Sequence, residues 1–279
     1  MRNITNELVF AFKTNLINQE KSKATLEKYL RDITAFMLWL NTRAVEKSVV
    51  LEYKNVLVER YAPSSVNSIL SSLNSFFSFN EWFDCLVKTI KVQKQIFSPA
   101  NRELTKTEYE RLLKAAHQKR NTKLFYLMQT ICATGIRVSE LKFITVGAVS
   151  KGEALINCKG KIRIVLLPKQ LCKMLKQYVR ENNITKGSVF VSKNGYPLDR
   201  SNIWKLMKSL CVYAGVPKDK AFPHNLRHLF ARTYYSLEKD IVRLADILGH
   251  SSVNTTRIYT AENGDVHRRQ IQKLGLLKC

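Results

Sequence analysis

The residue types that phosphoryl transfer requires are spaced along the second half of this chain. Two arginines, two histidines and one tyrosine stand in short polar segments there: Arg137, His224, Arg227, His250 and Tyr259. An arginine can grip two oxygens of one phosphate in bidentate fashion. A tyrosine hydroxyl can become a covalent phosphate carrier. The set predicts an enzyme that cuts a phosphodiester with tyrosine and keeps the bond energy in a phosphotyrosine link.

Each of these residues has a role that suits its chemistry. A phosphodiester under attack gains negative charge on its non-bridging oxygens, and cations fixed there lower the barrier. Arg137 and Arg227 are therefore the candidate clamps. Tyr259 is the candidate nucleophile, because its spacing of nine residues from His250 distinguishes it from the other tyrosines. His224 precedes Arg227 by three residues, on the same helix face, so it can hydrogen-bond the phosphate or take the tyrosine proton.

For His250 and His228, the sequence predicts where each side chain points. Gly249 is a typical helix terminator, and we expect His250 just after it to donate a hydrogen bond to a phosphate oxygen. His228 is expected to point to another side of its helix. We interpret it as a structural residue, with a buried hydrogen-bonding ring.

The charge of the chain is high and unevenly distributed. The 279 residues carry a net charge of +24. Residues 1–98 hold 13 Lys and Arg against 9 Asp and Glu, a net of +4, whereas residues 99–279 hold 33 against 13, a net of +20. An excess of this size calls for a polyanionic partner, and nucleic acid is favoured over a membrane surface because no basic amphipathic helix with an aromatic face stands out.

Several other classes of protein are disfavoured. No apolar run reaches the length of a membrane span, and the N-terminus lacks the pattern of a signal peptide. The six cysteines form no C-x-x-C pair, which fits reduced thiols in a cytoplasm and disfavours a metal site. Neither a carboxylate cluster for two metals nor a glycine-rich phosphate loop is present, so no cofactor is expected.

The hydrophobic pattern predicts mostly helices. Residues 1–96 read as a helical domain, with an apolar stripe over 25–40 and a second helix, capped by Ser64 or Ser65, whose apolar face runs through 66–77. Residues 97–103 are the expected linker, because Pro99 lies in a polar stretch.

Residues 104–279 form the expected second domain. Thr105 and Glu108 have the spacing of a capping box, and 123–132 is apolar enough for a buried helix. Residues 153–167 predict a hairpin that turns near Lys159-Gly160, and 188–191 a short strand. The predicted fold class is mainly α, with a small β-sheet in the second domain.

The four segments together resemble the tyrosine recombinases, the phage integrase family. The resemblance rests on A-T-G-I-R-V-S-E-L, H-x-L-R-H, L-G-H-S and T-T-R-I-Y, in this order. It is strong over 104–279 and weaker over 1–96. It implies a helical core-binding domain joined to an α+β catalytic domain, which together clamp duplex DNA, as in the simple Xer-like members.

The resemblance also implies supporting residues. Lys159 is similar to the family's lysine in G-K-G, which acts as general acid toward the leaving 5′ oxygen. Cys158 replaces the first glycine and the following segment is one residue shorter than usual, so Lys161 remains the alternative acid. Lys161 and Arg163 are otherwise candidate contacts to the DNA backbone. Glu140 is expected to support the site from behind Arg137.

The reaction implied by the resemblance is strand exchange between two double-stranded recombination sites, for integration, excision, inversion or dimer resolution. It implies a homotetramer or heterotetramer on DNA, and the apolar tail docks either on a neighbour or on its own subunit. The residues of that tail are Ile271, Leu274, Leu276 and Leu277. Two alternatives stay open: a type IB topoisomerase, and a non-catalytic DNA-binding regulator with a degenerate site.

Overall fold

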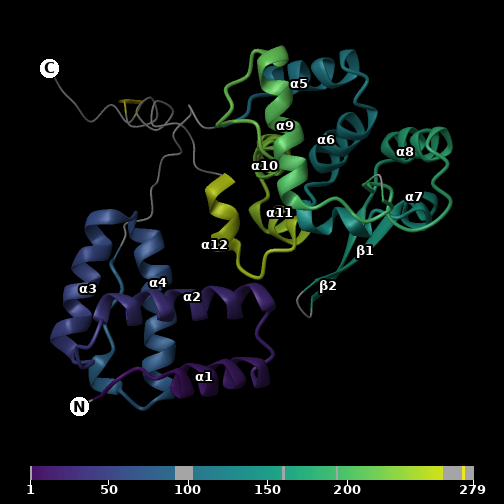
Figure 1. Cartoon of the computed structure of the whole chain (residues 1–279). Coiled ribbons are helices and arrows are strands. Elements are labelled where there is room, and N and C mark those ends of the chain that lie inside the picture. Colours follow the sequence, from purple (N-terminus) through teal and green to yellow (C-terminus); the bar gives the residue numbers. More distant parts are fainter. Residues whose placement is uncertain (1, 92–102, 159–160, 193, 260–271, 274–279) are drawn as a thin grey trace, which may run out of the picture. The chain divides into compact units, whose positions relative to one another are not determined.

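The chain forms two compact units. The computed structural model describes residues 2–91, 103–158, 161–192, 194–259 and 272–273 (Figure 1). The units are Met1–Lys94, here called unit 1, and Gln95–Cys279, here called unit 2. Most of the expected linker lies outside the described residues. Among the helices that are described, none is both long and apolar enough to cross a membrane.

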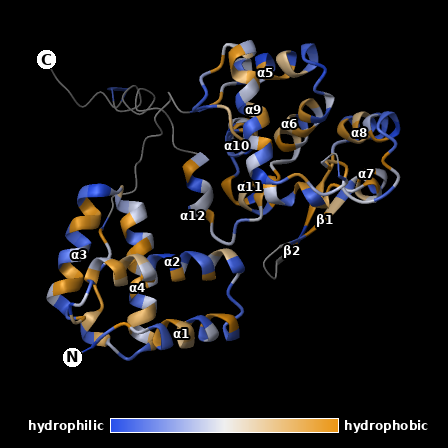
Figure 2. Ribbon diagram, viewed as in Figure 1, coloured by the Kyte–Doolittle hydropathy of each residue, from blue (hydrophilic) through white to orange (hydrophobic). Residues whose placement is uncertain are grey.

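The regular elements in the described part of unit 1 are all helices. Its elements are α1 (Asn6–Asn18), α2 (Lys23–Leu40), α3 (Lys47–Arg60), α4 (Pro63–Phe79) and the short 3-10 helix η1 (Phe83–Cys85). Each helix turns a hydrophobic side inward (Figure 2). Aromatic rings fill the core, where Phe12 meets Phe76 edge to face at 5.3 Å between ring centroids. The apolar stripe predicted over 25–40 is the buried face of α2.

The start of α4 differs from the prediction. The helix begins at Pro63, with Ala62 as its N-cap, and not at Ser64 or Ser65. Proline suits the first helical position because its φ is already helical and its missing N–H would have no partner there. The serines therefore lie inside the first turn, and the predicted cap was wrong.

Unit 2 packs its helices around α6. Its elements are α5 (Lys106–Gln118), α6 (Thr122–Thr134), the 3-10 helix η3 (Val138–Phe143), α7 (Val146–Lys151), β1 (Glu153–Cys158), β2 (Lys161–Leu166), α8 (Lys169–Glu181), α9 (Arg200–Ala214), α10 (Pro223–Glu238), α11 (Ile241–Leu248), α12 (Val253–Thr256) and the 3-10 helix η4 (Arg257–Tyr259). Helix α6 packs against α5, α8 and α10. The capping box of Thr105 and Glu108 is present at the start of α5.

The sheet is the predicted hairpin. Strand β1 pairs antiparallel with β2, and Cys158 faces Lys161 across the ladder. One face enters the core through Ala154, Ile156 and Val165. The strand predicted over 188–191 was wrong, because Ser188 and Val191 make only isolated bridges, to Thr145 and Pro197.

Candidate active site

Three separate segments of unit 2 meet around a side chain of a fourth, Arg227 of α10. Arg137 stands at the start of η3, just after α6. His250 follows the end of α11, and Tyr259 ends η4. Figure 1 shows α10, α11 and α12 gathered on one side of unit 2. The fold thus brings together residues that are more than one hundred positions apart in the chain.

The guanidinium of Arg227 is buried and donates several hydrogen bonds. The residue is 2% exposed. It donates hydrogen bonds to the carbonyl oxygen of Gly135, to that of Leu248 at 2.8 Å and to Nε2 of His250 at 3.0 Å. The oxygen of Tyr259 lies close enough to this guanidinium to raise its pKa. Burial, followed by the nearby positive charge of Arg137, lowers the pKa of Arg227 to about 10, so it stays a cation at neutral pH.

Two glycines make this arrangement possible. Gly135 ends α6 at a φ of 62° and Gly249 ends α11 at a φ of 63°, both in the left-handed region that favours glycine. A Cβ on Gly135 would collide with the ring of Phe230, and one on Gly249 with the side chain of Arg163. The glycines of two sequence boxes are therefore needed for close packing beside Arg227.

Glu140 holds two arginines in place. Its carboxylate accepts hydrogen bonds from Nη1 of Arg137 at 3.0 Å and from Nη2 of Arg163 at 2.7 Å, and also from the backbone N–H of Arg137 at 2.9 Å. Burial raises the pKa of this carboxyl, but the hydrogen bonds and the charge of Arg163 outweigh it, so its pKa lies below the ordinary value. The Arg137 side chain keeps 39% of its surface exposed, which leaves it open to a phosphate.

The side chain of Arg163 does not lie on the surface, where a contact to the DNA backbone would need it. Its side chain is only 16% exposed. It donates to Glu140 and, at 2.7 Å, to the carbonyl oxygen of Ile247 in α11. The expected surface cation is thus a largely buried link between β2, η3 and α11, because the strand turns this side chain inward.

Replacing Glu140 by glutamine should destabilise unit 2 by roughly 3 kcal/mol at pH 7, since it leaves two buried or half-buried arginines without their anion. The folded-state pKa of Glu140 is depressed. The stability that it contributes is therefore complete above the ordinary glutamate pKa and is lost as pH falls through the folded value. Urea unfolding of both proteins should show a gap that narrows below about pH 4; a gap independent of pH would contradict this assignment.

His250 has one defined tautomer. Arg227 can only donate, so Nε2 of His250 accepts and carries no proton. Nδ1 therefore holds the ring proton and donates to Oγ1 of Thr256 at 2.8 Å. Burial, followed by the charge of Arg227, lowers the pKa of His250 to about 4. The sequence led us to expect that His250 donates a hydrogen bond to a phosphate oxygen. In this structure its Nε2 instead accepts a hydrogen bond from Arg227.

His228 also differs from its expectation. It stands four residues after His224, so the two rings share a face of α10 and contact edge to face at 4.3 Å. Its ring also meets that of Tyr259 at 4.8 Å. The prediction that it points away from His224 was wrong, and the i, i+4 spacing was the signal that placed it. Its buried Nε2 has no hydrogen-bond partner among the described residues.

Some candidates cannot be placed. Lys159 lies outside the described residues, and of Lys161 only the backbone, at the start of β2, is described. The apolar tail residues Ile271, Leu274, Leu276 and Leu277 also lie outside them. Thr256 is a site residue that sequence reasoning missed; it stands in T-T-R-I-Y but shows its role only through its contact with His250.

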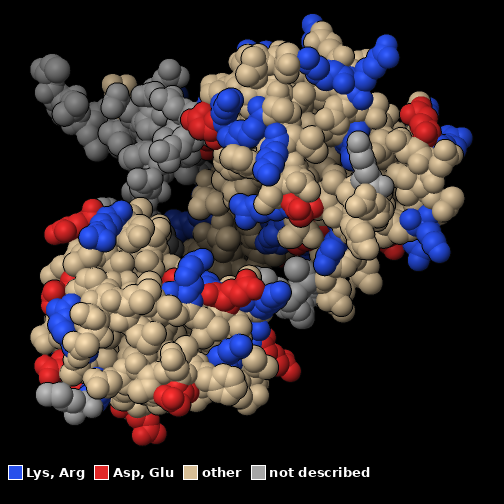
Figure 3. Space-filling view, in the orientation of Figure 1, with Lys and Arg blue, Asp and Glu red and all other residues tan. Residues whose placement is uncertain are grey.

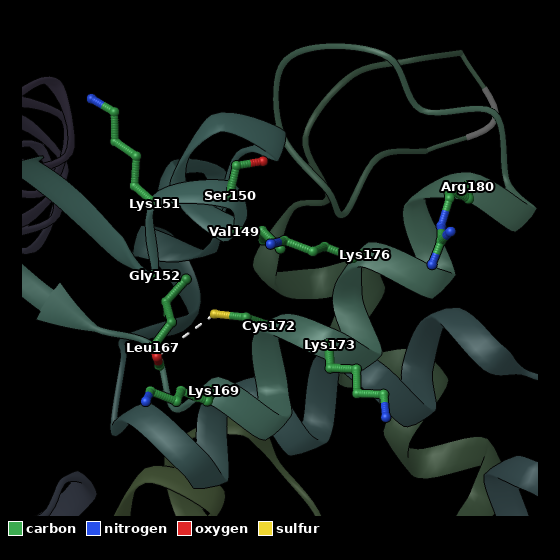
Figure 4. A pocket seen from close by; sticks show the side chains of 10 residues that line it. All are labelled: Val149, Ser150, Lys151, Gly152, Leu167, Lys169, Cys172, Lys173, Lys176 and Arg180. Atoms are coloured by element: carbon green, nitrogen blue, oxygen red, sulfur yellow. Dashed lines mark hydrogen bonds between the residues drawn. The ribbon is translucent and has the colours of Figure 1, made fainter.

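A separate groove lies between α7 and α8. It has a volume of about 430 Å³ and is lined by Lys151, Lys169, Lys173, Lys176 and Arg180, among other residues (Figure 4). The one thiol among the labelled residues is that of Cys172, whose Sγ donates to the carbonyl oxygen of Leu167. Burial raises the pKa of this thiol, which disfavours the reactive thiolate. The groove adds positive charge to unit 2, but it holds no activated nucleophile among its labelled residues.

Family profiles match both parts of the chain. The phage integrase family matches residues 102–265. The N-terminal SAM-like domain of phage integrases matches residues 9–82.

Individual proteins agree with this. Tyrosine recombinase XerH of Campylobacter jejuni is 38% identical over 172 residues, which are 58% of this chain but only 49% of XerH. Tyrosine recombinase XerA of Thermococcus kodakarensis is 28% identical over 284 residues, 98% of this chain and 97% of XerA.

Solved structures show the same architecture. The crystal structure of a XerA recombinase is 26% identical, covers 99% of this chain and all of its own, and has a TM-score of 0.52. A λ integrase tetramer bound to a Holliday junction has a TM-score of 0.72 at 18% identity, with 91% of this chain and 76% of the integrase covered. The second likeness is one of fold alone.

Proposed function

Because the chain belongs to the phage integrase family and is a tyrosine site-specific recombinase, we propose that Tyr259 is its nucleophile. The phenol oxygen forms a bond to phosphorus, the bond from phosphorus to the 5′ oxygen breaks, and a 3′-phosphotyrosine results. The phenol proton goes to a base in the site, and the 5′ oxygen takes a proton from a general acid and leaves as a hydroxyl. A 5′-hydroxyl of the partner duplex then reverses the step. Since the number of phosphate ester bonds is unchanged, the exchange needs no nucleotide.

The observation that carries this proposal is the contact of Tyr259 with Arg227. The tyrosine is buried, and its oxygen lies close enough to Arg227 to raise the pKa of that cation, which also donates to His250. A phosphate that reaches Arg227 would therefore lie next to the phenol. Of the other tyrosines, Tyr234 and Tyr235 pack on the apolar side of the same region.

The two arginines would bind the phosphate in different ways. Arg137 is half exposed, and Glu140 orients it from one side. Arg227 is buried, so a phosphate oxygen must replace the acceptor that Nε2 of His250 now provides. Such an exchange frees Nε2 of His250 at the moment the substrate arrives. Glu140 thus orients Arg137. His224 is exposed at the start of α10 and is the candidate acceptor of the tyrosine proton.

The assembly would be a tetramer on two double-stranded sites, in the cytoplasm. The λ integrase tetramer on a Holliday junction supports this arrangement by its fold. Cys85, Cys132, Cys172 and Cys211 are free thiols, which is in keeping with a reducing compartment. The excess of Lys and Arg in unit 2, spread over the face visible in Figure 3, suits a polyanion.

A nicked duplex that carries the target site tests the function. The nick lets the short cleaved strand diffuse away, so that a covalent protein–DNA adduct accumulates. We expect the adduct, and strand exchange when a partner duplex with a free 5′-hydroxyl is added. An adduct with relaxation of supercoiled plasmid but no exchange would indicate a topoisomerase, and binding without an adduct would indicate a regulator.

DNA binding should weaken steeply with salt. Residues 99–279 carry a net charge of +20, and each phosphate contact releases about one counterion, which gives a slope of roughly −0.9 per contact in a plot of log K against log salt. For about six contacts, affinity should fall by on the order of 10³-fold between about 50 and 200 mM salt. Fluorescence anisotropy with a labelled duplex measures this, and a flat plot would refute it.

A further inference from the structure

The direction of the Tyr259 ring is set by its neighbours. Tyr259 ends η4, a helix of three residues. So short a helix has few backbone hydrogen bonds with which to orient a side chain. The ring lies instead in a small apolar cluster with Ala231, Leu244 and Leu248. The packing of this cluster helps to hold the ring in place.

Two imidazoles contact the same ring from different elements. The ring of His228, on α10, stands perpendicular to the phenol, at 4.8 Å and 89°. The ring of His250, after α11, lies nearly parallel to it, at 6.1 Å and 15°. His250 is already engaged by Arg227 and Thr256. Among the described residues Nε2 of His228 has no such partner, so its ring is held by packing against the rings of His224 and Tyr259.

His228 is itself well fixed. One turn earlier on α10, His224 packs against it at 4.3 Å, and Nε2 of His228 is buried. Burial, followed by the charges of His224, Arg232 and Arg227, lowers the pKa of His228 to about 3. The ring is therefore neutral at physiological pH. A neutral aromatic ring can pack against a phenol beside Arg227, whereas a second cation there would be repelled.

We propose that His228 is a positioning residue for Tyr259, whose perpendicular contact keeps the phenol hydroxyl beside Arg227 and in line with the phosphate. The inference rests on the proposed function, because it concerns the nucleophile of that reaction. His228 acts through the phenol ring and takes no part in holding the phosphate. Its removal should therefore slow attack by tyrosine but not attack by a nucleophile that needs no positioning.

The first experiment measures the rate of adduct formation on the nicked duplex in a single turnover. His228→Ala should lower this rate by about 10- to 100-fold, the effect of a misplaced reacting group, with DNA affinity unchanged. His228→Phe keeps an aromatic ring at the same place and should recover most of the rate. His117→Ala, in α5 and away from the site, is the matched control and should behave as wild type.

The second experiment removes tyrosine from the reaction. In a Tyr259→Phe background, hydrogen peroxide at high concentration supplies a small nucleophile, whose oxygen attacks phosphorus while the 5′ oxygen leaves with a proton. Adding His228→Ala to this background should change peroxide cleavage by less than about threefold. A loss there as large as in the tyrosine reaction would overturn the proposal, because it would place His228 on the phosphate or in the folding of the site.

Other outcomes are equally decisive. An unchanged adduct rate in His228→Ala, or a His228→Phe variant as slow as alanine, would also overturn the proposal. Should alanine prevent folding, as judged by the melting temperature, His228→Asn takes its place in both experiments. A wild-type protein that forms no adduct would contradict the proposed function instead, and peroxide cleavage in the Tyr259→Phe background would still report on the phosphate site.

Discussion

Replacing Tyr259 by phenylalanine should abolish strand cleavage and leave DNA binding nearly unchanged. The substitution removes the attacking oxygen and keeps the ring, so the contacts with His228, His250 and the apolar cluster remain. The site then holds a phosphate between its arginines with no nucleophile to attack it. Denaturing gels of the nicked duplex should show no covalent adduct, while anisotropy should give the wild-type affinity.

Tyr234→Phe is the matched control for this loss. Tyr234 packs against the same apolar cluster as Tyr259, on α10, and loses the same single oxygen atom. It should form the adduct at the normal rate. An adduct in the Tyr259→Phe protein would move the nucleophile to another residue and refute the assignment.

Local rules predicted much of the fold. The capping box of Thr105 and Glu108, the helix over 123–132 and the hairpin over 153–167 all depend on residues near one another in the chain, and α5, α6, β1 and β2 confirm them. Two predictions of the same local kind were wrong: the serine cap of α4 and the strand over 188–191. Proline overrode the serines at the first helical position, and the apolar run found only isolated bridges as partners.

The site was predictable in its residue types but not in their partners. The order and spacing of the boxes selected Arg137, Arg227, His250 and Tyr259, and the fold brings these four together. Arg163 could not be assigned in this way. Nothing in the sequence around a single arginine in a strand indicates that the carboxylate of Glu140, 23 residues away, will bind it. Long-range contacts of this kind come from packing, which no local pattern records.

Lys159→Ala should slow cleavage of an ordinary phosphodiester by about 10²- to 10⁴-fold, the range that a general acid contributes. We propose Lys159 as that acid because two residues, 159 and 160, join β1 to β2, and a hairpin tip can carry an ammonium to the leaving 5′ oxygen. An alkoxide is a poor leaving group and needs a proton as it departs. Rapid-quench measurement of adduct formation gives the rate.

A substrate with a 5′-bridging sulfur separates Lys159 from Lys161. A thiolate leaves without a proton, since the pKa of a thiol is about 8.5, so this substrate does not need the acid. Lys159→Ala should cut it at nearly the wild-type rate, and Lys161→Ala should be close to wild type on both substrates. Sulfur rescue of Lys161→Ala but not of Lys159→Ala would move the acid to Lys161. Rescue of neither would make both lysines contacts to the DNA backbone and assign proton donation to another residue.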